Sequence, residues 1–269
     1  MPRVRRKLGT ALIVLGVLAL GYGASVYFWK DPVTSLYTSW QQRQLDGQLE
    51  EAFAAFQAEN DGALEAAATV GVPSPADGST PTSISAPADA TGAYATDAAA
   101  QAELMAEQTR AAAERFLAKM KPGQALGRMT IPKLDIDPIF VNGTTSGDLR
   151  KGPGRYPQTS IPGLGQLTAI AGHRTTFGAP FRYINELAKG NEIVLELPYG
   201  TFTYRVEGHK IVDDEDWSVI EPRGYDALML SACEPLYSAE KRWIVYAKLV
   251  KVRLPDGASY REPEVVASG

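Results

Sequence analysis

One cysteine, Cys233, stands at the end of an apolar run, ALMLSAC, and Arg242 follows it nine residues later. A histidine, His173, lies upstream in the segment AIAGHRTTFG. A thiol, an imidazole and a guanidinium can act as nucleophile, general acid or base, and oxyanion partner, a set that suits acyl transfer without a metal. A lone thiol cannot form an internal disulfide, so Cys233 is either buried and inert or reactive.

The N-terminus indicates on which side of a membrane this chemistry would take place. Four basic residues precede an uncharged stretch from Leu8 to Trp29, and Lys30 follows it. The stretch is long enough for a helix to cross a hydrocarbon layer of about 30 Å. Basic residues on the leading side predict a cytoplasmic N-terminus and a single-pass type II protein with its remainder outside the cell. A cleaved signal peptide is the alternative, but its apolar core usually has only about 7 to 15 residues.

Composition adds little beyond this topology. Acidic residues slightly outnumber basic ones, 31 to 27, and the basic excess is confined to the leader. Nothing in this distribution indicates nucleic-acid binding.

The segment after the anchor is rich in helix formers. From Thr34 to about Thr69, apolar residues at three- and four-residue spacing predict an amphipathic helix, broken near Gly47 or Gly62. A stretch rich in Pro, Ser, Thr, Ala and Gly, residues 70–95, predicts a disordered linker. A second helix is expected over 96–120, and we interpret all of this as a spacer stalk. A dimerising coiled coil lacks the sustained heptads it needs.

From about Ala125 the sequence changes to short β-type runs separated by turn residues, which is typical of a small barrel or sandwich. A hairpin is expected at 198–200 and one short helix at 180–188. The expected strands cover 127–134, 137–143, 167–172, 191–197, 201–212, 227–233 and 242–252. The expected division is 1–30 for leader and anchor, 31–122 for the stalk, 123–255 for the catalytic domain and 256–269 for a C-terminal tail.

The candidate residues fall at the ends of expected strands. His173 follows one apolar run, and Glu234-Pro235 ends the run that carries Cys233, because proline cannot join a central ladder. Strand-end loops are where a rigid scaffold commonly presents chemistry.

At these residues the chain resembles the sortases, membrane-anchored cysteine transpeptidases of Gram-positive bacteria. The resemblance covers about 127–253 and includes IPKLDIDPIFV, GPGRYP, AGHRTTFGAPF and LSACEPLYSAEKRWIVYAKL. The histidine segment and the nine-residue interval from cysteine to arginine are most similar to class E. The resemblance implies a mainly β fold, a closed barrel of about eight strands with short helices.

The resemblance also implies a function. Cys233 would attack the threonine carbonyl of an LAxTG- or LPxTG-type sorting signal, His173 would protonate the leaving amine, and Arg242 would hold the oxyanion or position the substrate. The expected partners are surface proteins that carry this signal, together with a lipid II-like peptidoglycan precursor or a pilin lysine as the amine. No cofactor is expected. Sortases usually carry threonine immediately before the cysteine, where this chain has Ala232.

Other functions stay open at this point. A catalytically weak sortase-fold scaffold or binding module, a pilin-polymerising sortase and an enzyme that only hydrolyses its thioester are alternatives. Papain-like hydrolases place cysteine before histidine, and L,D-transpeptidases place the two within one motif. Neither arrangement matches the 60 residues from His173 to Cys233.

Four further features receive structural interpretations. We expect His209 to be a surface or structural histidine, Arg174 to point away from the reacting atoms, and Trp217 to cap the core. The acidic run 213–216 is interpreted as a solvated loop, with a calcium site as the alternative.

Overall fold

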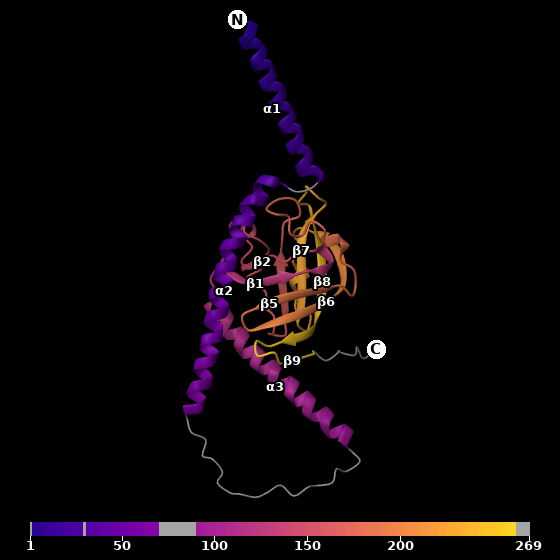
Figure 1. Ribbon diagram of the computed structural model, residues 1–269. Coiled ribbons are helices and arrows are strands. Elements are labelled where there is room, and N and C mark those ends of the chain that lie inside the picture. The colour runs from indigo at the N-terminus through magenta and orange to yellow at the C-terminus, as the bar shows by residue number, and fades with distance from the viewer. Residues whose placement is uncertain (1, 29–30, 70–89, 262–269) are drawn as a thin grey trace, which may run out of the picture.

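The computed structural model describes residues 2–28, 31–69 and 90–261, and its centre is a mainly β barrel (Figure 1). The strands are β1 (Ala125–Thr130), β2 (Ile139–Asn142), β3 (Gly154–Arg155), β4 (Leu167–Ala171), β5 (Glu192–Leu197), β6 (Gly200–Asp213), β7 (Ala227–Glu234), β8 (Lys241–Arg253) and β9 (Ser259–Tyr260). The strand order is β6-β5-β1-β2-β3-β4-β7-β8-β9, and an additional pairing of β6 with β8 closes a ring of eight. The expected closed barrel is therefore confirmed, with β9 attached to the edge of β8.

Alternation along the strands divides the core in two. On β7, Leu228, Leu230 and Ala232 belong to the cluster that fills the barrel, whereas Ala227 and Met229 pack in a second cluster on the outer face. The expected hairpin at 198–200 is confirmed, because Leu197 pairs directly with Gly200.

Several local predictions differ from the structure. The helix expected at 180–188 is only a 3-10 turn, η2 (Ile184–Glu186), although Phe181, Ile184 and Leu187 are buried as their spacing indicated. Pro132 begins another 3-10 turn, η1 (Pro132–Leu134), where a strand was expected to continue. The short elements β3, β9 and α4 (Ser146–Leu149) were not predicted, because two to four residues carry too little periodicity to detect.

In the described part of the chain, three long helices precede the barrel: α1 (Pro2–Phe28), α2 (Pro32–Thr69) and α3 (Ala90–Lys119). The break expected near Gly47 or Gly62 was wrong, since α2 runs through both glycines. One interior glycine costs a helix only about 1 kcal/mol relative to alanine, which packing can offset. Residues 70–89 of the expected linker lie outside the described residues, whereas the expectation was wrong for residues 90–95, which belong to α3.

The helices α2 and α3 pack against the barrel, so the described parts of these two helices are not a free-standing stalk. Leu45 and Leu49 of α2 are buried with Ile139 and Val141 of β2. Phe116 of α3 joins the main core cluster. The sequence pattern showed an apolar stripe on α2 but not the surface it covers.

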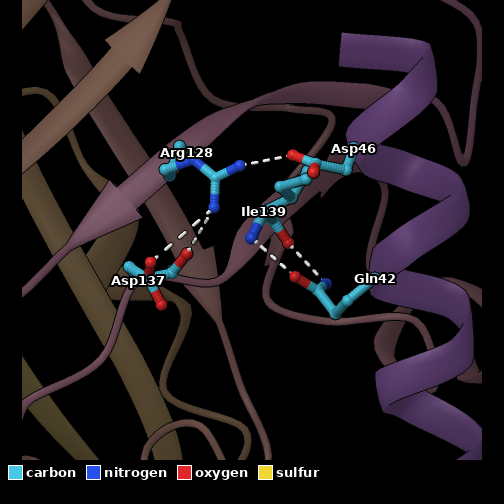
Figure 2. A network of polar contacts seen from close by, with 5 residues as sticks. All are labelled: Gln42, Asp46, Arg128, Asp137 and Ile139. Atoms are coloured by element: carbon cyan, nitrogen blue, oxygen red, sulfur yellow. Dashed lines mark hydrogen bonds and ion pairs between the residues drawn. The ribbon is translucent and has the colours of Figure 1, made fainter. Parts of the chain in front are cut away.

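Polar contacts fix α2 in register with the barrel (Figure 2). The Gln42 amide donates to the Ile139 carbonyl at 2.9 Å and accepts from the Ile139 N–H at 2.7 Å, in the manner of a neighbouring strand. Arg128 of β1 forms an ion pair with Asp46 of α2 and donates to the Asp137 carbonyl at 3.2 Å. Because these bonds use specific atoms, α2 has one position along the barrel.

Candidate active site

The register of three adjacent strands brings the candidate residues to one end of the barrel. Strands β4 and β7 are parallel, with Ala171 opposite Ser231, and His173 and Cys233 each lie two residues further on. Strands β7 and β8 are antiparallel, and Cys233 lies directly opposite Arg242. Directly opposed residues project from the same face of a sheet, so the thiol and the guanidinium share one side.

That side is the outer face of the barrel. Alternation puts Cys233 on the face of Met229, in the outer cluster, and Arg242 on the face of Ile244 in the same cluster. The thiol is a free cysteine of intermediate exposure, so it can be reached from solvent. The cysteine is therefore not a buried core residue.

The loop after β4 is held closely to its neighbours. The Gly172 N–H donates to the Ser231 carbonyl at 3.0 Å, which continues the pairing of β4 with β7. A Cβ at Gly172 would lie 2.5 Å from a ring carbon of Phe181, so only glycine fits here. The Phe181 N–H then donates to the His173 carbonyl at 3.0 Å, which fixes the backbone at the histidine.

The surroundings of His173 disfavour its charged form. Burial lowers the pKa of this imidazole below its usual 6.5, and the nearby positive charge of Arg150 lowers the pKa further. The ring lies 5.2 Å from that of Phe177. At neutral pH the imidazole is therefore mostly neutral and able to accept a proton.

Arg174 is a residue whose role the sequence did not reveal. Its side chain is only 5% exposed; it forms an ion pair with Glu234 and donates to the Cys233 carbonyl at 3.1 Å and to Asn185 at 2.8 Å. It thus joins the histidine loop to the cysteine strand. The expectation that it points away from the reacting atoms stays a prediction, and the HR dipeptide was the only signal in the sequence.

Arg242 is more open than Arg174. Its Nη1 donates to the Ala239 carbonyl at 2.7 Å and to the Lys241 carbonyl at 3.0 Å. Its Nη2 lies 3.9 Å from Asp214, and the side chain is 27% exposed. An arginine held at one nitrogen can turn its other donors toward a substrate oxygen.

Ala232, the departure from the usual sortase pattern, faces the interior. It is 3% exposed and packs in the main core cluster of the barrel. Its methyl group therefore lies on the side of β7 opposite to Cys233.

The remaining candidates lie apart from the trio. His209 is exposed and stacks on Trp243 at 4.8 Å, in agreement with a surface role. Trp217 is 59% exposed, so the expectation that it caps the core was wrong; it contacts Tyr156 edge to face.

The acidic run does not converge on one point. Asp216 accepts from the Ser218 N–H at 3.1 Å and caps a 3-10 turn, η3 (Trp217–Ile220), while Asp214 faces Arg242. Within the described parts of the chain, no group of three or more His, Cys, Asp or Glu side chains is placed to hold a metal ion. A solvated loop stays the prediction for the acidic run, and calcium binding stays its alternative.

Comparison with known proteins identifies the family. The sortase domain profile matches residues 129–250. The chain is 39% identical over 136 residues to sortase D of Bacillus subtilis, covering 49% of this chain and 67% of that one. It is 31% identical to sortase SrtE1 of Streptomyces coelicolor, covering 52% of this chain and 44% of that one. The chain belongs to the sortase family, whose members are cysteine transpeptidases.

Solved structures of sortases are also similar to this chain. The crystal structure of sortase E1 from Streptomyces coelicolor with a tripeptide in its active site has 30% identity and a TM-score of 0.49, covering 54% of this chain and 98% of that one. Sortase E from Streptomyces avermitilis has 33% identity and a TM-score of 0.47. The relatives include sortases D, E1 and A, so class E stays a prediction.

Proposed function

We propose that this protein is a membrane-anchored cysteine transpeptidase that cleaves an LAxTG- or LPxTG-type sorting signal after threonine and joins the released carbonyl to a cell-wall precursor amine. The observation that carries this proposal is the register of β4, β7 and β8, which brings His173, Cys233 and Arg242 to one end of the barrel and puts Cys233 and Arg242 on one face. A lipid II-like peptide amine is the acceptor that the family favours.

The first half of the reaction forms a thioester. His173 takes the proton of the Cys233 thiol, and the sulfur attacks the threonine carbonyl carbon. Arg242 donates to the oxygen that becomes negative. The threonine–glycine C–N bond then breaks, and His173 returns its proton to the leaving amine.

The second half resolves the thioester. The acceptor amine attacks the same carbonyl carbon, a new amide bond forms and the C–S bond breaks. The proton lost by the amine passes through His173 to the sulfur, so no oxidant or reductant is consumed. Water in place of the amine gives hydrolysis.

The test uses the full chain in detergent with a quenched LAxTG or LPxTG peptide. We expect a covalent adduct on Cys233 by mass spectrometry, and none with Cys233→Ala. The absence of an adduct with both peptides would contradict transpeptidation and favour a scaffold or binding module. Adding a peptide amine distinguishes transfer from hydrolysis, because only transfer yields the joined product.

Membrane anchoring belongs to the same proposal. Residues Arg6–Tyr27 of α1 are long and apolar enough to cross a membrane, and none of that window is buried in the described structure. A helix of this composition without a protein surface to cover is suited to lipid. Basic residues before it favour an N-terminus inside the cell and a barrel outside.

A further inference from the structure

The first turns of α2 carry an exposed apolar stripe. Its members recur at the i, i+3, i+4 and i+7 spacing that puts side chains on one helix face. The exposed fractions are 63% for Val33, 75% for Leu36, 43% for Tyr37 and 48% for Trp40. We call this set the juxtamembrane stripe: Val33, Leu36, Tyr37 and Trp40.

The juxtamembrane stripe ends abruptly along the helix. The next exposed positions of α2 are Arg43 and Gln44, followed by Gly47 and Gln48, and none of these is a large apolar residue. At 1.5 Å per residue the stripe is about 10 Å long. Interfacial helices bury their apolar side chains about 5 to 10 Å deep at the boundary of headgroups and acyl chains. The exposed large apolar side chains that can enter such a zone are therefore confined to the first turns of α2.

The stripe begins where the apolar helix ends. α1 ends at Phe28, and α2 starts at Pro32 at the same end of the barrel (Figure 1). Asp31 fixes the connection, because its carboxylate accepts from the Val33 N–H and from the Tyr22 hydroxyl, each at 3.0 Å. The stripe is therefore continuous with the segment that is suited to cross a membrane.

The loop between β7 and β8, which follows Cys233, contacts the end of α1. The Tyr237 hydroxyl donates to the carbonyls of Val26 at 2.8 Å and Tyr27 at 2.6 Å, and the rings of Tyr237 and Tyr27 stack at 5.8 Å. Arg182, from the loop after His173, donates to the Tyr27 carbonyl at 3.2 Å. The last carbonyls of a helix have no partner within it, and leaving them bare near lipid is costly.

The histidine loop contacts the start of α2. The Phe177 N–H donates to the Thr34 hydroxyl at 2.8 Å, and the Phe177 ring lies between Tyr37 at 6.4 Å and His173 at 5.2 Å. Phe177 and Tyr237 have φ values of 50° and 68°, which bulky residues rarely adopt. Such strained residues persist only where their surroundings fix them, and here the surrounding contacts include those from α1 and α2.

We propose that the juxtamembrane stripe lies in the headgroup region of the membrane. It thereby holds two loops at the lipid surface, the loop that carries His173 and the loop that follows Cys233. The inference rests on the proposed anchoring by α1. It turns the first turns of α2 from a tether into a docking element. An amine carried on a lipid would then meet the thioester without the barrel having to approach the membrane.

The experiment measures contact with lipid at single positions of the full chain. Cysteines are introduced by Leu36→Cys, Gln48→Cys or Leu104→Cys in a Cys233→Ala background and labelled with a fluorophore. The chains are reconstituted in vesicles of phosphatidylcholine and phosphatidylglycerol, with a lipid nitroxide near the headgroup as quencher. Leu104 is a matched control, because it is an exposed leucine on α3, 55% exposed. We expect quenching at position 36 to exceed that at 48 and 104 by about twofold or more, given the shallow depth of interfacial side chains.

Two outcomes would overturn the inference, and both are distinct from failure of the anchor. If the chain floats with the vesicles but position 36 is quenched no more than position 104, the stripe does not contact lipid. If position 36 is shielded only at high protein-to-lipid ratio and without nitroxide quenching, a second copy of the chain covers the stripe instead. If the chain does not float at all, the anchoring proposal fails, and the inference fails with it.

Discussion

At the scale of residues, two arginines lie beside the cysteine strand, Arg174 in the loop after β4 and Arg242 on β8, and their hydrogen bonds separate their roles. Arg174 is engaged with Cys233, Glu234 and Asn185, whereas Arg242 retains open donors. We expect Arg242→Lys to lower kcat/KM by about 100-fold or more, the typical loss when an oxyanion donor is removed, with little change in Tm.

The matched substitution is Arg174→Met, which removes one partner of a largely buried ion pair. We expect it to lower the free energy of unfolding by about 3 kcal/mol. Thermal unfolding in detergent and peptide cleavage measure the two effects. Full activity of Arg242→Lys, combined with loss of activity at an unchanged Tm in Arg174→Met, would reverse the two assignments.

The pH dependence of the enzyme belongs to the same scale. The thiol and imidazole share one proton in the active state, so a second proton on the pair abolishes activity as pH falls through the pKa of His173. That pKa is lowered by burial and by Arg150. We expect the acidic limb of kcat/KM below pH 6.5, and Arg150→Gln to move it to higher pH.

Arg150→Lys is the control for this shift, because it keeps the positive charge. The measurement is the profile of kcat/KM against pH for the unchanged protein, Arg150→Gln and Arg150→Lys. The acidic limb should move only in Arg150→Gln. Equal movement of the limb in both variants would mean that the contact of Arg150 with Phe177, at 5.6 Å, matters and its charge does not.

At the scale of elements, α2 is part of the folded unit. Leu45 and Leu49 are 2% and 4% exposed, in contact with the outer face of β1 and β2. We expect Leu45→Ala or Leu49→Ala to lower the free energy of unfolding by about 2 to 5 kcal/mol, through lost burial and the cavity left behind. Gln48→Ala, on the exposed face of the same helix, should change it by about 0.5 kcal/mol or less. If all three substitutions had equally small effects on thermal unfolding, α2 would be a spacer that does not belong to the folded unit.

At the scale of the whole molecule, the single cysteine reports topology. If α1 enters the membrane with its N-terminus inside, the barrel lies outside and Cys233 is open to solvent there. A membrane-impermeant maleimide added to intact cells should label the protein, and Cys233→Ala should abolish the labelling. Labelling of Cys233 only after permeabilisation would contradict the orientation. The same orientation requires the active-site end of the barrel to face the membrane, since Tyr237 contacts the end of α1.

The sequence by itself determined the local features. Short β-type runs separated by turn residues predicted most of the longer strands, and the uncharged stretch after the basic leader predicted the apolar helix. The motifs around His173 and Cys233 indicated the family and the candidate trio. These signals are local, because each depends on side chains a few residues apart.

Only the tertiary structure decided which of these parts meet. Pairing of β6 with β8 closes the barrel, and the register of β4 with β7 brings His173 level with Cys233, 60 residues away in the sequence. The bonds of Arg174, the docking of α2 and the exposure of Trp217 likewise depend on distant partners. The physical reason is that such contacts depend on shape and register between elements, which no local period encodes.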